Sequence, residues 1–153
     1  MLIRTGVSAL ILAALPLCFG QSSDEARAKL WGSWKADGNA SSSETWELRD
    51  ADGTLHMVRT ESDRKNEVEC NVMGRECKIK SLDGKPATVS FYFNGPKLIE
   101  WEKEGDKVVR RRFTAVDGDT LEVETTSIVP NGKPETTHLK RVADSAAIAT
   151  NTK

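Results

Sequence analysis

The chain has 153 residues, of which 29% are charged and 38% hydrophobic, and its formal net charge at pH 7 is −1. This length fits a single domain with one hydrophobic core. Acidic and basic residues are nearly balanced and mixed along the chain, which argues against a nucleic-acid-binding surface, and no basic amphipathic helix indicates contact with a membrane surface.

Residues 1–20 have the pattern of a cleavable secretion signal. Arg4 gives a minimal basic start, the segment from Val7 to Leu17 is almost entirely apolar, and small residues allow cleavage after Gly20. The apolar run is too short for a membrane-spanning helix, and no later segment approaches one. We therefore predict a secreted or periplasmic protein; an uncleaved anchor is the alternative.

Cys18 offers a second way of processing this leader. Its acylation would give a lipoprotein, but Leu17 stands where lipoprotein processing needs a small residue. With cleavage after residue 20, the loss of Arg4 changes the net charge from −1 to −2. We assign residues 21–142 to one folded domain and predict that the small and polar residues 143–153 form a disordered tail.

A short helix is predicted ahead of the first strand. Ser22 followed three residues later by Glu25 fits a capping box, and residues 24–30 favour a helix. Gly32 then ends the helix and frees the backbone to enter a strand.

From Gly32 to Val142, turn signals such as Asn-Gly and Asp-Gly recur about every ten residues. The segments between them are rich in β-branched and aromatic residues, and several alternate between apolar and polar side chains, as half-buried antiparallel strands do. One turn is predicted at residues 63–66. After a first strand from Gly32, strands are predicted over 45–49, 54–61, 67–71, 77–80, 87–93, 97–103, 107–114, 120–129 and 135–142.

This succession predicts an all-β fold, an antiparallel up-and-down β-barrel of about 8–10 strands with a short N-terminal helix. The links are short, and closure removes exposed strand edges. A two-sheet sandwich uses the same local pattern and is the structural alternative.

Cys70 and Cys77 are the cysteines that remain after cleavage, and an even count in an exported chain predicts one disulfide, here across the base of a hairpin. Free thiols and metal binding are the alternatives. Neither His56 nor His138 stands at ligand spacing from the cysteines, so no metal site is predicted.

The stretch Leu30-Trp31-Gly32-Ser33-Trp34-Lys35 resembles the first strand of the lipocalin and fatty-acid-binding proteins, the calycin superfamily, and most of all the small exported lipocalin-like proteins of bacteria. The resemblance implies a closure role for Gly32, Trp34 and Arg141. In that superfamily the tryptophan closes one barrel end, while a late arginine packs across its ring and hydrogen-bonds to backbone near the N-terminus. Lys140 takes that place if the strand register differs by one.

Barrels of this size either fill with side chains or hold one small ligand. A cavity would have an apolar lining, whereas the alternative role of the same side chains is core packing. The candidate apolar contacts are Met57, Phe91, Phe93, Trp101 and Val123.

Arg111 shares a strand face with Val109 and Phe113, whereas Arg110 and Arg112 share the other face. If Arg111 points inward it can pair with a ligand carboxylate, as arginines inside fatty-acid-binding barrels do. The alternative is that Arg111 pairs with an internal glutamate while the other two arginines face water.

Catalytic patterns are not found: His56 and His138 lie on alternating strands rather than beside a nucleophile motif, so we predict no enzyme and no cofactor. The sequence favours a monomeric exported protein that binds a small apolar or amphipathic ligand in the barrel. The alternative is a secreted interaction or inhibitor module that uses the loop 71–76, with Val72, Met73 and Arg75 as contacts.

Overall fold

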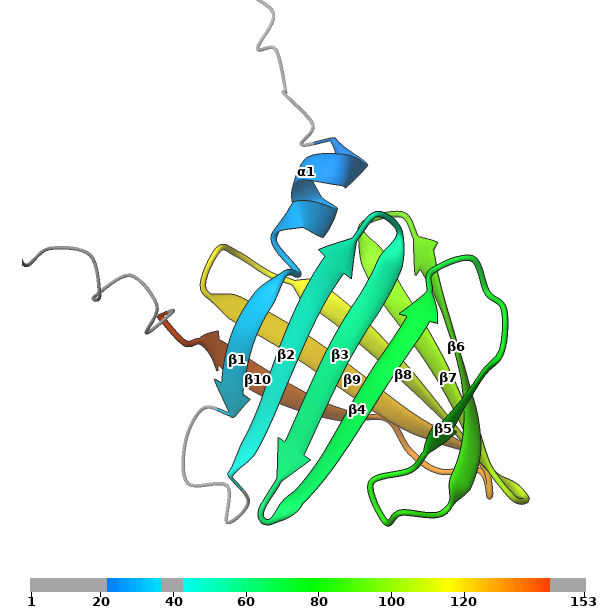
Figure 1. Ribbon diagram of the computed structural model, residues 1–153. Helices are drawn as coiled ribbons and strands as arrows, with labels where there is room; N and C mark the ends of the chain where they lie inside the picture. The colour runs from blue at the N-terminus through cyan, green and yellow to red at the C-terminus, as the bar shows by residue number, and fades with distance from the viewer. Residues whose placement is uncertain (1–21, 37–42, 144–153) are drawn as a thin grey trace, which may run out of the picture.

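The computed structural model describes residues 22–36 and 43–143. The predicted secretion signal, Cys18 and residues 144–153 of the predicted tail lie outside the described residues. The described elements are α1 (Ser23–Ala28), β1 (Gly32–Ala36), β2 (Glu44–Ala51), β3 (Thr54–Glu61), β4 (Arg64–Asn71), β5 (Cys77–Lys80), β6 (Pro86–Asn94), β7 (Lys97–Glu104), β8 (Lys107–Ala115), β9 (Thr120–Val129) and β10 (Glu135–Arg141) (Figure 1).

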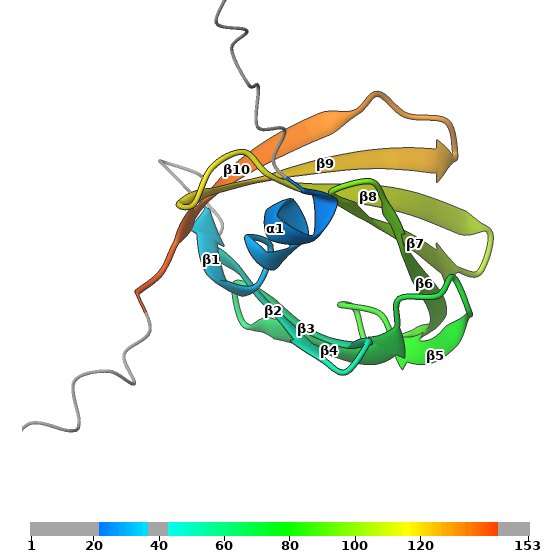
Figure 2. The ribbon, with the colours of Figure 1, turned by 90° about the horizontal axis from the view of Figure 1, so that it is seen from above.

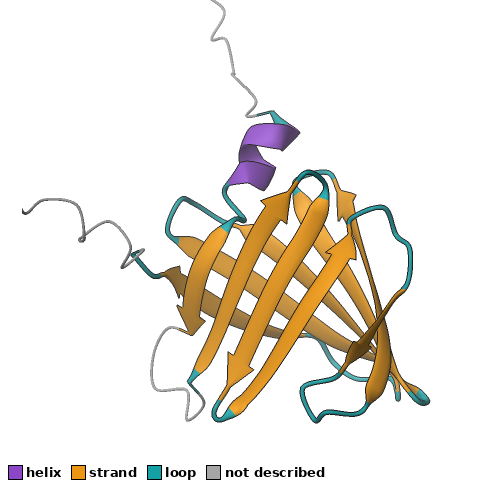
Figure 3. Ribbon diagram, in the orientation of Figure 1, coloured by secondary structure: helices purple, strands orange, loops and turns teal. Residues whose placement is uncertain are grey.

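The ten strands form one antiparallel sheet in the order β4-β3-β2-β1-β10-β9-β8-β7-β6-β5. Strand β1 pairs with both β2 and β10, so the two ends of the meander meet. The sheet curves into a nearly closed barrel, with α1 over one end (Figure 2). Most links are hairpin turns (Figure 3). The predicted up-and-down barrel is confirmed, and the sandwich alternative is wrong because all the described strands share one sheet.

The helix begins as its capping signal indicates. The Ser22 side chain accepts a hydrogen bond from the Glu25 backbone N–H at 3.3 Å, and α1 ends at Ala28. No helix within the described residues is long and apolar enough to cross a membrane.

The predicted turn at residues 63–66 is tighter than expected. Strand β3 ends at Glu61 and β4 begins at Arg64. Ser62 adopts a φ of 56° between them. Because Ser62 adopts this left-handed conformation, the chain reverses over residues 62 and 63. Residues 64–66 of the predicted turn therefore belong to β4.

The disulfide between Cys70 and Cys77 is present, but its predicted place at the base of a hairpin is wrong. It joins β4 and β5, the two end strands of the sheet, which do not pair with each other. After β4 the chain runs along β6 instead: Met73 bridges Tyr92, and the Gly74 N–H donates to the Phe91 carbonyl at 2.7 Å. The disulfide therefore fastens the seam of the barrel.

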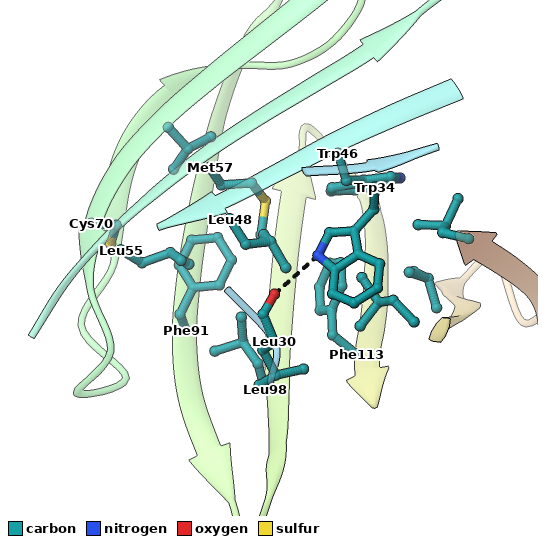
Figure 4. Close-up of a cluster of buried hydrophobic side chains, with 14 of the residues drawn as sticks. Leu30, Trp34, Trp46, Leu48, Leu55, Met57, Cys70, Phe91, Leu98 and Phe113 are labelled. Carbon is teal, nitrogen blue, oxygen red and sulfur yellow. Dashed lines mark hydrogen bonds between the residues drawn. The ribbon is translucent and has the colours of Figure 1, made fainter. Parts of the chain in front are cut away.

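The α1 end of the barrel is filled with apolar side chains. Leu30, which follows α1, is fully buried together with Trp34, Phe91 and Phe113 (Figure 4). The Trp34 Nε1–H donates to the Leu30 carbonyl at 3.0 Å. Because the indole N–H is satisfied, the largest side chain of this core is buried without an unpaired polar group.

Arg141 closes this end from outside. Its guanidinium carbon lies 4.1 Å from the centre of the Trp34 ring, and Nη1 and Nη2 donate to the carbonyls of Trp31 and Lys29, each at 2.8 Å. Gly32 has a φ of 134°, and a Cβ there would collide with Arg141 Nη1. Lys140 instead donates to the Thr120 hydroxyl, so Arg141 rather than its neighbour packs on the indole.

Candidate functional site

Most of the predicted apolar ligand contacts lie in the filled α1 end. Met57, Phe91 and Val123 belong to the buried core. Phe93 is half-buried, with its ring edge-to-face against Trp31 at 6.2 Å. The Arg27 guanidinium lies 4.5 Å from the same ring. In this structure these side chains contact other side chains of the protein.

Trp101 does not line the interior, and that expectation is wrong. It pairs with Ser90 and Arg110 on the outer face of the sheet. Its Nε1–H donates to the Tyr92 hydroxyl at 3.4 Å, and the Arg110 guanidinium lies 6.0 Å from its ring. The physical reason is the pleat of β7, which turns Glu100 and Glu102 inward and Trp101 outward.

Arg111 points into the barrel at the end away from α1. Its Nη1 contacts Glu100 Oε1 at 2.9 Å and Glu102 Oε2 at 2.6 Å. The three side chains are 10%, 5% and 17% exposed. Arg110 and Arg112 both pair with Glu124 on the outer face. Of the two alternatives from the sequence, the structure therefore shows the pairing of Arg111 with internal glutamates.

A second arginine extends this buried charge cluster. Arg59 Nη2 pairs with Glu44 Oε1 at 3.0 Å and with Glu61 Oε2 at 3.3 Å. Trp46 lies beside both arginines: its ring centre is 4.9 Å from the guanidinium of Arg59 and 6.0 Å from that of Arg111. The sequence interpretation missed Arg59, although its two-residue spacing from Met57 on β3 places both on the inner face.

Burial sets the protonation of Glu100. Desolvation raises its pKa above the ordinary value and the charge of Arg111 lowers it in part, with a net upward shift. Its second oxygen, Oε2, is buried without a hydrogen-bond partner among the described residues. Burial disfavours the charged form of Arg111, but its interactions with Glu100 and Glu102 outweigh this effect and raise the pKa of Arg111. The arginine therefore stays charged while Glu100 resists ionisation.

A cavity of about 450 Å³ opens at this end of the barrel, and we call it the mouth. It lies among the turns between β3 and β4, β5 and β6, and β9 and β10, opposite α1 (Figure 1). Its wall includes Arg59, Glu61, Val109, Arg111, Thr125 and Ser127. A smaller recess of about 60 Å³ shares Asp83, Lys107, Val109 and Arg111 with the mouth and reaches Glu102. The mouth thus leads from solvent to the buried charge cluster.

The histidines stand apart from this site. His56 and His138 lie on the outer face, near Glu69 at 3.9 Å and Glu122 at 3.5 Å. Within residues 22–36 and 43–143, no group of three or more histidine, cysteine or acidic residues is placed to hold a metal ion.

Comparisons of the whole chain support the fold. No protein-family model matches the chain, and no curated protein sequence does so either. Among solved structures, a Schistosoma mansoni fatty-acid-binding protein in complex with arachidonic acid superimposes with a TM-score of 0.66 at 15% identity, over 77% of this chain and 99% of that one. The fold is that of the fatty-acid-binding proteins.

Two further structures share this fatty-acid-binding-protein fold. Secretory abundant heat soluble protein 4 from Ramazzottius varieornatus gives a TM-score of 0.64 at 17% identity, over 74% of this chain and 95% of that one. As-p18, an extracellular fatty acid binding protein, gives 0.63 at 17% identity, over 74% and 96%. At these identities the likeness is one of fold, and these neighbours are binding or heat-soluble proteins rather than enzymes.

Proposed function

We propose that this protein is an exported, monomeric binding protein that holds one small amphipathic molecule in the mouth of its barrel. The observation that carries the proposal is the cavity of about 450 Å³ that leads to Arg111 and its glutamate partners. This volume lies within the usual range of ligand sites, which combine apolar walls with a few convergent polar groups. The proposal assigns no catalytic residue and no cofactor.

Because the α1 end is filled, we place the ligand in the mouth rather than in the centre of the barrel. Leu30, Phe91 and Phe113 are fully buried in the apolar half, so a ligand there would have to displace core side chains. At the mouth, Val109 and Leu82 offer apolar surface beside the arginines. An amphipathic molecule matches this mixture of surfaces.

Export has independent support. The secretion pattern of residues 1–20 agrees with the Cys70–Cys77 disulfide, because disulfides persist in oxidising compartments. A neighbour of the same fold, As-p18, is named as extracellular.

The test is to purify the protein natively, extract it with organic solvent and identify the released molecule by mass spectrometry. We expect one compound at a ratio near one to one, as measured by native mass spectrometry. Thr125→Trp should abolish its retention, because Thr125 lines the mouth and the indole would fill it. Thr136→Trp is the control, since Thr136 is exposed on the neighbouring strand. Equal retention by the two variants would refute the mouth as the site.

A second candidate function is protein interaction through the loop 71–76. Met73 is 75% exposed and bridges Tyr92, which is 37% exposed, and the disulfide and Gly74 hold the loop in place. Met and Tyr are enriched in protein interfaces. Val72, one of the predicted contacts, packs instead against the core. Met73→Asp should weaken a partner's binding, whereas Val116→Asp, at another exposed valine, should leave it unchanged.

A further inference from the structure

The charges at the inner end of the mouth decide which ligand class the site accepts. Arg59 and Arg111 are each already paired with two carboxylates, and four glutamates share these two guanidinium groups. A ligand carboxylate that entered here would compete with glutamates that are already in place. In a partly desolvated site, that repulsion is much stronger than in water.

The recess beside the mouth holds three carboxylates as well. The recess of about 60 Å³ is lined by the carboxylates of Asp83, Glu102 and Glu104 and by the cations of Lys107 and Arg111. Glu102 pairs with Arg111, Asp83 with Arg64 and Glu104 with Lys85. A hydrogen bond from Ser81 lowers the pKa of Glu104, so this carboxylate stays charged at neutral pH. A recess of this size fits an ammonium group or a small hydrogen-bond donor rather than an alkyl chain.

A buried carboxyl oxygen next to the recess lacks a hydrogen-bond partner. Glu100 Oε2 is inaccessible to solvent and has no hydrogen-bond partner among the described residues. Glu100 lines a narrow interstice together with Glu102 and Arg111, which also line the recess. Buried carboxyl oxygens are rarely left unpaired, and a cationic donor from the recess would both pair this oxygen and offset the burial that opposes ionisation of Glu100.

We propose that the polar group of the ligand is a cation that donates hydrogen bonds, so that the protein binds amphipathic amines in preference to fatty acids. This inference rests on the proposed function. The ammonium group occupies the recess near Glu102, and the alkyl part lies along Val109 in the mouth. Arg64, Lys107 and Lys133 also face the mouth, but they are exposed, and solvent and salt screen them more than the glutamates inside.

The experiment titrates the purified protein with octylamine, octanoate and 1-octanol at pH 7 by isothermal calorimetry. The three probes share one chain length and differ in head-group charge. We expect octylammonium to bind at least about tenfold more tightly than octanoate, with octanol between them. Octanoate binding as tightly as octylammonium, or more tightly, would overturn the inference while leaving the proposed function intact. If none of the three binds, the proposed function fails with it.

A variant separates recognition from folding. Glu102→Gln removes a carboxylate of the recess while Glu100 still pairs with Arg111. We expect it to weaken octylammonium binding about tenfold, to strengthen octanoate binding and to leave octanol unchanged. Glu124→Gln is the matched control, because Glu124 pairs with Arg112 on the outer face. A purely structural role for Glu102 predicts instead the same change for all three probes, which would contradict the proposal.

Discussion

Arg141 holds together parts of the chain that are far apart in sequence. Its guanidinium donates to the carbonyls of Lys29, Trp31 and Gly118 and stacks on Trp34. The carbonyls come from the segment after α1 and from the β8–β9 turn. One side chain therefore satisfies the polar groups at a barrel end that has no regular pairing of its own.

Replacing Arg141 by methionine should destabilise the protein by about 2–4 kcal/mol, because three charge-assisted hydrogen bonds and a cation–π contact are lost together. Urea unfolding followed by tryptophan fluorescence measures the change. Lys140→Met is the control and should cost less than about 0.5 kcal/mol, since Lys140 is exposed. Equal losses in the two variants would show that Arg141 contributes no more than a surface charge.

Position 32 requires glycine for two reasons, its backbone conformation and its close contact with Arg141. Gly32→Ala should destabilise by about 2 kcal/mol or more, because a φ of 134° is strained for alanine and the added methyl meets Arg141. Gly84→Ala separates the two effects: Gly84 has a φ of 77° with open space around its Cβ position, so only about 1 kcal/mol is expected. Thermal unfolding of both variants measures the difference. A loss at Gly32 no larger than at Gly84 would remove the steric part of the argument.

At the scale of the elements, the least secured part of the barrel is the seam between β4 and β5. The two strands do not share backbone pairing, and they are joined by the disulfide, by Asn66 Nδ2 donating to the Lys80 carbonyl and by the Arg64–Asp83 ion pair. Strand β5 has a paired neighbour, β6, on one side only. Its stability therefore depends on side-chain links more than that of any central strand.

Replacing Cys70 and Cys77 together by alanine should lower the free energy of unfolding by about 2–3 kcal/mol, because a short covalent loop is opened. The loss should be concentrated at the seam. The hydrogen-exchange rate of the β5 amides should increase much more than that of the β9 amides, because β9 is paired on both sides. Hydrogen-exchange mass spectrometry of the wild type and the double variant measures this. Uniform acceleration over all the strands would mean that the seam does not open on its own.

The sequence predicted the strands well because turn residues such as those at Asn94-Gly95 act locally. It could not predict the seam, because which two strands remain unpaired depends on how the whole sheet closes. The sequence pattern also did not show which face of the sheet Trp101 occupies. Leu98, Ile99 and Glu100 are buried in succession on β7, so this part of the strand shows no clean alternation. A glutamate inside and a tryptophan outside reverse the usual preference.

At the scale of the whole molecule, the barrel interior has two halves of different chemistry. The α1 end is apolar and filled, whereas the other end holds paired charges beneath an open mouth. The sequence identified Arg111 as a candidate for the interior, but it did not predict the mouth. Part of its lining comes from the turns around Asp83, Lys107 and Lys133, which only the closed barrel brings together.

This division predicts how stability depends on pH. The folded-state pKa of Glu100 is raised, so the folded state favours its protonated form. The contribution of Glu100 is then fully present below its unfolded pKa and is lost as the pH rises through the higher folded value. Glu100→Gln keeps an uncharged acceptor for Arg111 at every pH. The variant should therefore gain stability relative to the wild type as the pH rises from about 4 towards 8.

Urea unfolding of the wild type and Glu100→Gln at several pH values tests this, with Glu124→Gln as the control on the outer face. Glu104 and Asp117 have lowered pKa values, so their contributions are lost as the pH falls, but they are common to all three proteins and cancel in the differences. A difference that shrinks with rising pH would mean that Arg111 outweighs desolvation and keeps Glu100 ionised. The buried cluster would then hold its full negative charge without a ligand.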